Sequence, residues 1–278
     1  MTEITAHHGL FRNTNLHVDD TGGPGRPVVL IHGWPLSGAA WKDQVPALYQ
    51  AGYRVVTYDR RGFGRSDKPM SGYTYSTLAE DLHTLLRELD INDVTIVGFS
   101  MGGGEVARYF SLYGAERLHS VVFASAVTPY LLQTSNNPDG PLTKTEAAKM
   151  AASLTTNQDS FYDEFMTKFF SANGKLTVTE AQRQEALALC QQADKKASLA
   201  CMTAFGSTDF RDDLAKVTVP TLVLHGDSDA TVPFDGSGKR THNAIAGSKL
   251  HLIVGAPHGC NVSHAGEWNS VLLAFLTA

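Results

Sequence analysis

One serine of this chain lies in a pattern that could make it a nucleophile. Ser100 is the centre of GFSMG at 98–102, which fits G-x-S-x-G. The apolar run 94–97 precedes the motif and a segment of helical composition follows it, as expected for a serine on a sharp strand-to-helix turn. The N–H groups at the start of such a helix face developing negative charge. We therefore predict that Ser100 is a nucleophile, the alternative being a glycine-rich turn with a spectator serine.

A serine nucleophile needs a base, and the base needs a group that orients it. After a G-x-S-x-G serine the expected chain order is acid and then histidine. His258 follows the apolar run 250–254 in the loop GAPHG, and catalytic groups of open parallel sheets gather beyond the carboxyl ends of strands. We predict that His258 is the base, the alternative being a loop histidine with a structural hydrogen bond.

Two aspartates compete for the role of the acid. Both Asp227 and Asp229 follow the run 221–225, in the segment HGDSD. Asp229 lies further into the loop and is followed by Thr231-Val232-Pro233, so we favour Asp229. Asp227 is then expected to hold the turn through its own backbone hydrogen bonds.

The elements that must position these residues alternate between two types. Short apolar runs are typical of strands that are buried on both faces. The predicted strands are 28–31, 54–58, 94–97, 121–124, 221–224 and 250–254. Leucines at steps of three and four predict a helix over 77–89, and its opening Thr77-Leu78-Ala79-Glu80 fits a capping box. This alternation predicts an α/β fold with a mostly parallel sheet and helices on both faces.

Residues 128–213 interrupt the pattern. They contain no convincing strand, and prolines break their beginning. The predicted helices there are 143–154, 158–170, 178–192 and 194–206, and a last helix is expected at about 264–277. We therefore predict one core made of residues 1–127 and 214–278, with 128–213 inserted as a helical cap over Ser100.

The composition excludes several classes of function. The 278 residues carry 23 Lys and Arg against 28 Asp and Glu, a net charge of −5, which argues against a nucleic-acid binder. The longest apolar runs are far too short to cross a bilayer, and residues 1–5 lack the features of a secretory signal. Three cysteines without metal-ligand spacing are typical of a reducing cytoplasm, and no His, Asp or Glu cluster indicates a metal site.

Several motifs together make the chain similar to a known superfamily. They are HGWP at 32–35, YDRRGFGRS at 58–66, GFSMGGG at 98–104, HGDSD at 225–229 and APHG at 256–259. Over nearly its whole length the chain resembles the α/β-hydrolases, and among them the cofactor-free bacterial haloperoxidases, or perhydrolases, with their aryl-esterase and γ-lactamase relatives.

The resemblance assigns a role to individual residues. It implies that Ser100, Asp229 and His258 form a catalytic triad. It also implies an oxyanion hole made by the backbone N–H groups of Trp34 and Met101, although Trp34 could be only a pocket wall. Two fixed donors aimed at the tetrahedral oxygen are what acyl transfer requires. No cofactor and no metal are implied.

The implied reaction is attack of Ser100 on an ester carbonyl, followed by release of the acyl group to water. Release to hydrogen peroxide gives a peracid, which oxidises bromide or chloride. The expected partners are a small ester or carboxylic acid, with hydrogen peroxide and halide. Neither a nucleic acid nor a membrane is expected as a partner, and the sequence leaves open whether the chain forms a homo-oligomer. The alternatives are an amidase or γ-lactamase on the same triad, and a small-molecule binding protein with little turnover.

The expected acyl pocket is apolar and largely aromatic. Phe161, Phe165 and Phe169 recur at four-residue spacing and form one stripe of a helix, which is core or pocket wall. The pocket residues suggested by the resemblance are Pro35, Val127, Leu131, Phe165, Phe169 and Val232. Proline has a fixed φ and no N–H, so Pro35 could direct the Trp34 carbonyl toward hydrogen peroxide, or be an ordinary turn proline. We interpret Arg60-Arg61 as a solvated or ion-paired turn.

Overall fold

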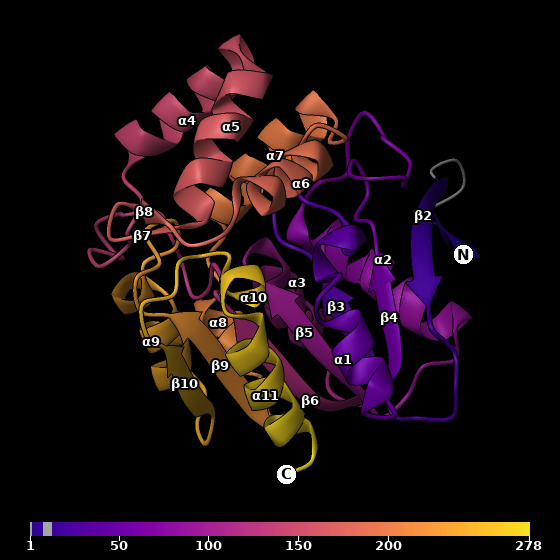
Figure 1. Cartoon of the computed structure of the whole chain (residues 1–278). Coiled ribbons are helices and arrows are strands. Elements are labelled where there is room, and N and C mark those ends of the chain that lie inside the picture. The colour runs from indigo at the N-terminus through magenta and orange to yellow at the C-terminus, as the bar shows by residue number, and fades with distance from the viewer. Residues whose placement is uncertain (1, 8–12) are drawn as a thin grey trace.

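An eight-stranded sheet forms the centre of the computed structural model, which describes residues 2–7 and 13–278 (Figure 1). Its order is β1-β2-β4-β3-β5-β6-β9-β10. The strands are β1 (Thr2–His7), β2 (Asn13–Asp20), β3 (Pro27–Ile31), β4 (Arg54–Tyr58), β5 (Val94–Phe99), β6 (Leu118–Ala124), β9 (Thr221–Gly226) and β10 (Lys249–Ile253). The pairs from β4 to β10 are parallel, whereas β1 and β2 join antiparallel. The predicted α/β fold with a mostly parallel sheet is confirmed, but β1 and β2 were not predicted.

Helices cover both faces of the sheet, which is why its central strands are mostly apolar and buried. The chain moves from β3 to β4 in one direction through α1 (Val45–Gln50) and then returns past β3 to β5 through α2 (Tyr75–Glu88). Right-handed crossovers therefore place α1 and α2 on opposite faces. The other core helices are α3 (Met101–Tyr113), α8 (Arg211–Leu214), α9 (Gly238–Ala244), α10 (Cys260–Ser263) and α11 (Ala265–Leu276), with 3-10 turns η1 (Gly38–Trp41) and η2 (Phe234–Gly236). Contacts join α2, α3, α8 and α9 in one row, and α1 with α11.

The start of α2 differs from the sequence prediction. The helix begins at Tyr75, two residues earlier than predicted, because Thr74 is extended and its side chain accepts a hydrogen bond from the Thr77 N–H. The predicted capping box from Thr77 to Glu80 is therefore wrong. The predicted apolar face is present, since its leucines from Leu78 to Leu86 are buried.

Four of the five helices between β6 and β9 lie together over the carboxyl ends of the parallel strands (Figure 1). They are α4 (Lys144–Thr156), α5 (Gln158–Phe169), α6 (Glu180–Cys190) and α7 (Lys195–Ser207). Each begins at a residue whose side chain caps its first turn, as helix N-termini prefer. The expectation of no strand in this segment is wrong in one detail, because β7 (Ser171–Ala172) and β8 (Lys175–Leu176) form a minimal antiparallel pair.

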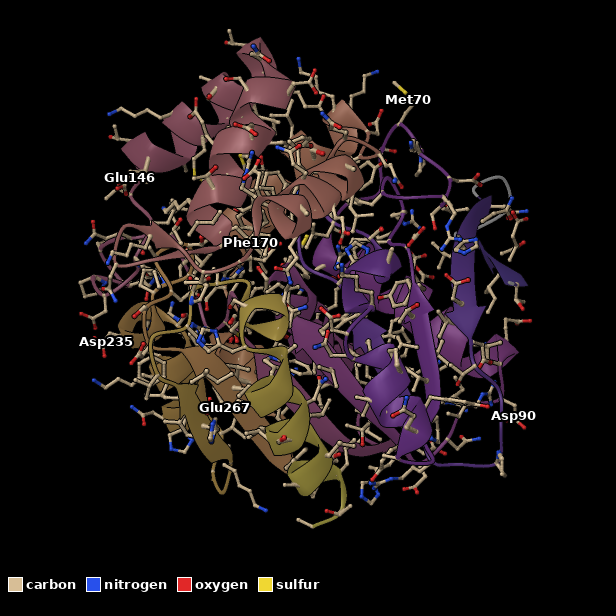
Figure 2. All side chains as sticks on the ribbon, viewed as in Figure 1. Met70, Asp90, Glu146, Phe170, Asp235 and Glu267 are labelled. Carbon is tan, nitrogen blue, oxygen red and sulfur yellow. The ribbon has the colours of Figure 1, made fainter. Side chains whose placement is uncertain are left out.

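The chain enters and leaves this helical segment at one place. The Phe210 N–H, after α7, donates to the carbonyl of Pro129, before α4, at 2.8 Å. Figure 2 shows Phe170 between these helices and the sheet, where it is fully buried, and Glu146 at the periphery. In the ranges that the structure describes, no helix combines the length and apolarity that a bilayer crossing requires.

Candidate active site

Ser100 occupies a strained turn between β5 and α3. Its φ of 54° and ψ of −116° are values that a residue with a side chain rarely adopts, and such strain persists only where the surroundings enforce it. The surroundings here are backbone hydrogen bonds. The Ser100 N–H donates to the Ala124 carbonyl at 2.8 Å, and its carbonyl accepts from the N–H groups of Gly103 and Val127 at 3.1 and 3.2 Å.

The glycines on either side of the serine are required by close backbone contacts. A Cβ on Gly98 would lie 2.5 Å from the carbonyl oxygen of Gly102, and a Cβ on Gly102 would lie 2.7 Å from that of Ile31. Both obstacles are main-chain atoms, which cannot move aside as a flexible side chain can. The G-x-S-x-G pattern therefore reflects how tightly the turn packs on itself and against β3.

The structure brings together the three side chains that the sequence analysis selected. His258 Nε2 lies 2.9 Å from Ser100 Oγ, and His258 Nδ1 lies 2.6 Å from Asp229 Oδ2. The three residues follow β5, β9 and β10 respectively, at the carboxyl edge of the sheet. All three are buried, so the series of hydrogen bonds is shielded from water.

Asp229 is held so that one oxygen faces the histidine. Its Oδ1 accepts the N–H groups of Thr231 and Val232 at 2.9 and 2.8 Å, which leaves Oδ2 for His258. Burial by itself raises the pKa of Asp229, but the charge of His258 and hydrogen bonds from His225 and His258 outweigh it, so the pKa lies below the usual 3.8. Because a carboxylate faces Nδ1, that nitrogen carries the proton and Nε2 is free to accept the proton of Ser100.

Asp227, the competing aspartate, has a different place. It is exposed, and its Oδ1 accepts the N–H of Gly255 at 2.7 Å and the hydroxyl of Ser228 at 2.9 Å. It therefore ties the loop after β9 to the loop after β10, instead of bonding the backbone of its own turn as expected.

The predicted donors of the oxyanion hole are the backbone N–H groups of Met101 and Trp34. Met101 is the first residue of α3, so its N–H has no partner within the helix. The loop that carries Trp34 lies against the nucleophile, since a Cβ on Gly33 would be 3.1 Å from Ser100 Cβ. Within the described ranges, neither the Trp34 nor the Met101 N–H donates a hydrogen bond to another protein group.

A cavity of about 720 Å³ opens from Ser100 toward α4 and α5. Its inner wall is aromatic, with the Trp34 ring in edge-to-face contact with the rings of Phe161, Phe165 and Phe205 at 5.2–6.1 Å. Of the predicted wall residues, Val127, Leu131, Phe165 and Val232 line this cavity. Its charged side chains, Glu146, Lys149, Glu164 and Lys168, are exposed.

Two predicted wall residues, Phe169 and Pro35, do not line the cavity. Phe169 is one turn deeper in α5 than Phe165, and its buried ring meets the His258 ring edge-on at 4.9 Å. It therefore packs behind the imidazole. Pro35 is buried after Trp34, and the peptide bond between the two is cis.

Sequence reasoning missed two polar groups around this site. His225 is the fourth residue before Asp229, and its Nε2 lies 2.8 Å from the Val232 carbonyl and 3.3 Å from Asp229 Oδ2. Glu105 in α3 forms a buried ion pair with Arg60. Of the two alternatives for Arg60, solvated or ion-paired, the structure shows the ion-paired one. The position of His225, at the start of the HGDSD segment that contains Asp229, was a signal that could have identified it. Nothing in the sequence indicated that Glu105 pairs with Arg60.

Several known proteins are similar to this chain over most of its length. Residues 26–265 match the family model described as alpha/beta hydrolase fold. A putative non-heme chloroperoxidase from Synechocystis is 41% identical, covering 99% of this chain and all of its own. A bifunctional esterase/perhydrolase from Acinetobacter calcoaceticus is 35% identical over 92% of this chain and 94% of its own. The crystal structure of a bromoperoxidase from Bacillus anthracis is 50% identical, with a TM-score of 0.95 over the whole of both chains.

Proposed function

The chain belongs to the alpha/beta hydrolase fold family, and from this premise we propose that it is a serine esterase for small carboxylic esters that also performs perhydrolysis. The observation that carries the proposal is the continuous hydrogen bonding from Asp229 through His258 to Ser100 at the base of an apolar cavity. The relatives named as chloroperoxidase and as esterase/perhydrolase support the same two activities.

The acylation step uses each group once. Ser100 Oγ attacks the ester carbonyl while His258 Nε2 takes its proton, and the ionised Asp229 stabilises the imidazolium that results. The N–H groups of Trp34 and Met101 stabilise the tetrahedral oxyanion, and each such donor is worth about 10²–10³ in rate. The imidazolium then protonates the leaving alcohol, which departs and leaves an acyl-enzyme on Ser100.

The acyl-enzyme has two fates. Water, deprotonated by His258, releases the carboxylic acid. Hydrogen peroxide in the place of water releases a peracid, and the peracid passes one oxygen and its proton to a halide ion, giving the carboxylate and a hypohalous acid. The oxidant is the peroxide itself, so the proposed halide oxidation needs no redox cofactor.

The same proposal includes two assignments outside the chemistry. We take residues 128–213 as a cap over the nucleophile, because side chains of α4, α5 and α7 line the cavity above Ser100. We also place the protein in the cytoplasm, on the ground of its three unpaired cysteines.

A series of p-nitrophenyl esters of increasing acyl length, with and without hydrogen peroxide and bromide, tests the proposal. We expect turnover of short acyl and aryl esters, and bromination of an indicator dye only where bromide, peroxide and an acyl donor, either the ester or a carboxylic acid, are all present. Ser100→Ala should abolish turnover and labelling by a fluorophosphonate without a change in Tm. Labelling that survives this substitution would remove the basis of the proposal.

A second variant tests the perhydrolase part separately. No protein group donates to the Trp34 carbonyl within the described ranges, so this oxygen is available to accept a hydrogen bond from peroxide. Replacing Pro35 with leucine changes the constraint on that peptide, and we expect a lower ratio of peracid to carboxylic acid at unchanged ester hydrolysis. An unchanged ratio would leave Pro35 as a turn residue only.

A further inference from the structure

We propose that the buried Arg60–Glu105 ion pair is a positioning device that holds the two backbone donors of the oxyanion hole in register with each other. The inference rests on the proposed function, because it assigns a role in stabilising the oxyanion of acyl transfer. It gives a role to two charged residues that touch neither the cavity nor the triad.

The pair joins the ends of three neighbouring strands. Arg60 follows β4, the loop with His32, Gly33 and Trp34 follows β3, and Glu105 lies in α3 after β5. In the sheet these strands are adjacent, in the order β4-β3-β5. The side chains of Arg60 and Glu105 are 1% and 0% exposed, so the pair lies inside the protein between the two segments that carry the donors.

On one side, Arg60 fixes the peptide that carries the Trp34 donor. Its Nη2 donates to the His32 carbonyl at 2.7 Å, and its backbone N–H donates to His32 Nε2 at 2.9 Å. Because Nε2 accepts, the ring proton lies on Nδ1, which donates to the Gly33 carbonyl at 2.9 Å. That carbonyl and the Trp34 N–H belong to one planar peptide unit, so fixing the oxygen fixes the direction of the N–H.

On the other side, Arg60 is bound to the helix that carries the Met101 donor. Its Nε donates to Glu105 Oε1 at 2.6 Å, and the Tyr58 hydroxyl donates to Glu105 Oε2 at 2.9 Å. Glu105 is four residues after Met101, which is about one helical turn. A guanidinium suits this task because its rigid fork can bind a carboxylate and a carbonyl in fixed directions at the same time.

The burial of the pair favours a specific task over a general gain in stability. Replacing a buried ion pair by apolar residues of similar volume is often neutral or stabilising, whereas removing one partner leaves an unpaired buried charge. The chain also contains a matched control. Arg61 forms a buried ion pair with Asp81 at 2.5 Å, and its Nε and Nη2 both donate to this aspartate of α2.

The test compares two double variants of the full chain, Arg60→Met/Glu105→Leu and Arg61→Met/Asp81→Leu. The readouts are the kinetics on p-nitrophenyl butyrate and the Ki of an alkyl boronic acid, which forms a tetrahedral adduct on a catalytic serine. For the Arg60 variant we expect an unchanged KM and a kcat lower by about 10- to 100-fold, since a shift of about 1 Å at a reacting site costs about 10²-fold. The boronate Ki should rise by the same factor.

The controls separate positioning from folding. The pH profile of kcat/KM should keep its shape, because the triad is untouched, and the Arg61 variant should keep the wild-type boronate Ki. If the Arg60 double variant does not fold, Glu105→Gln replaces it; this change keeps an acceptor for Arg60 and should give a smaller rise in Ki. A wild-type Ki in the Arg60 or Glu105 variant, or an equal rise in the Arg61 variant, overturns the inference. If the wild-type protein neither cleaves the ester nor binds the boronate, the proposed function itself has failed.

Discussion

Asp229→Asn is the substitution that most directly tests the proposed chemistry, because the structure fixes how the new amide must lie. Oδ1 of Asp229 accepts two backbone N–H groups, at 2.9 and 2.8 Å. An amide keeps both bonds only if its oxygen takes that place and its NH₂ faces His258. The opposite orientation sets the NH₂ against two donors, and each lost bond costs about 1–3 kcal/mol.

An NH₂ facing His258 Nδ1 forces the ring proton onto Nε2. The histidine can then no longer accept the Ser100 proton, and the imidazolium loses its carboxylate partner. Such a change in a serine triad lowers kcat by about 10⁴-fold, which corresponds to about 5.5 kcal/mol in the barrier. We expect a loss of this size in kcat/KM on p-nitrophenyl acetate and in the rate of fluorophosphonate labelling.

Asp227→Asn is the matched control, two residues away on the same loop. Its carboxylate is exposed and bonds Gly255 and Ser228, so we expect activity within about twofold of wild type, in line with the small effects of surface substitutions. Two results would refute the assignment of the acid. One is an Asp229→Asn variant that keeps about a tenth or more of the wild-type kcat/KM. The other is an Asp227→Asn variant whose kcat/KM falls about 10⁴-fold, the loss expected for Asp229→Asn.

Three further predictions follow from the geometry. Gly102→Ala sets a Cβ 2.7 Å from a backbone oxygen of β3 and should lower the free energy of unfolding by about 1–3 kcal/mol, measured in urea, whereas Gly266→Ala, with open space around it, should not. Phe165→Ala enlarges the cavity and should shift the best p-nitrophenyl ester to a longer chain, whereas Phe169→Ala, behind the imidazole, should lower kcat without that shift. The pKa of Asp229 is below 3.8, so its stabilisation is complete above about pH 4 and declines as the pH falls; in an acid titration of unfolding, the free energy of unfolding should fall more steeply with decreasing pH in wild type than in Asp229→Asn.

Local sequence patterns were sufficient for most of the fold because they report burial directly. The central strands appear as unbroken apolar runs since both of their faces are covered, and the helices from α4 to α7 appear at nearly the predicted residues. The strands β1 and β2 were missed because they join one edge of the sheet antiparallel and lack such runs. The two-residue strands β7 and β8 are too short to leave any periodic signal.

The candidate site was predictable where a residue type is dictated by the backbone. Gly98 and Gly102 are required by main-chain contacts, so the motif around Ser100 could be read locally. Phe169 packs behind the imidazole and not in the cavity wall because of the way α5 packs on the core. A four-residue spacing in the sequence gives no information about that packing. The pairing of Arg60 with Glu105 crosses three strands, and only tertiary packing brings the two together.

The hydrogen bond between the Phe210 N–H and the Pro129 carbonyl has a consequence for changes in the cavity wall. It joins the two ends of the helical segment, so the chain leaves the sheet after β6 and returns toward β9 at one place. A graft of different helices between these two ends would have to keep the contacts that the segment makes with the site, such as the Phe169 ring against His258 and the Phe165 ring against Trp34. Substitutions confined to this one contiguous stretch of sequence can therefore change the wall of the cavity, which α4, α5 and α7 supply in part.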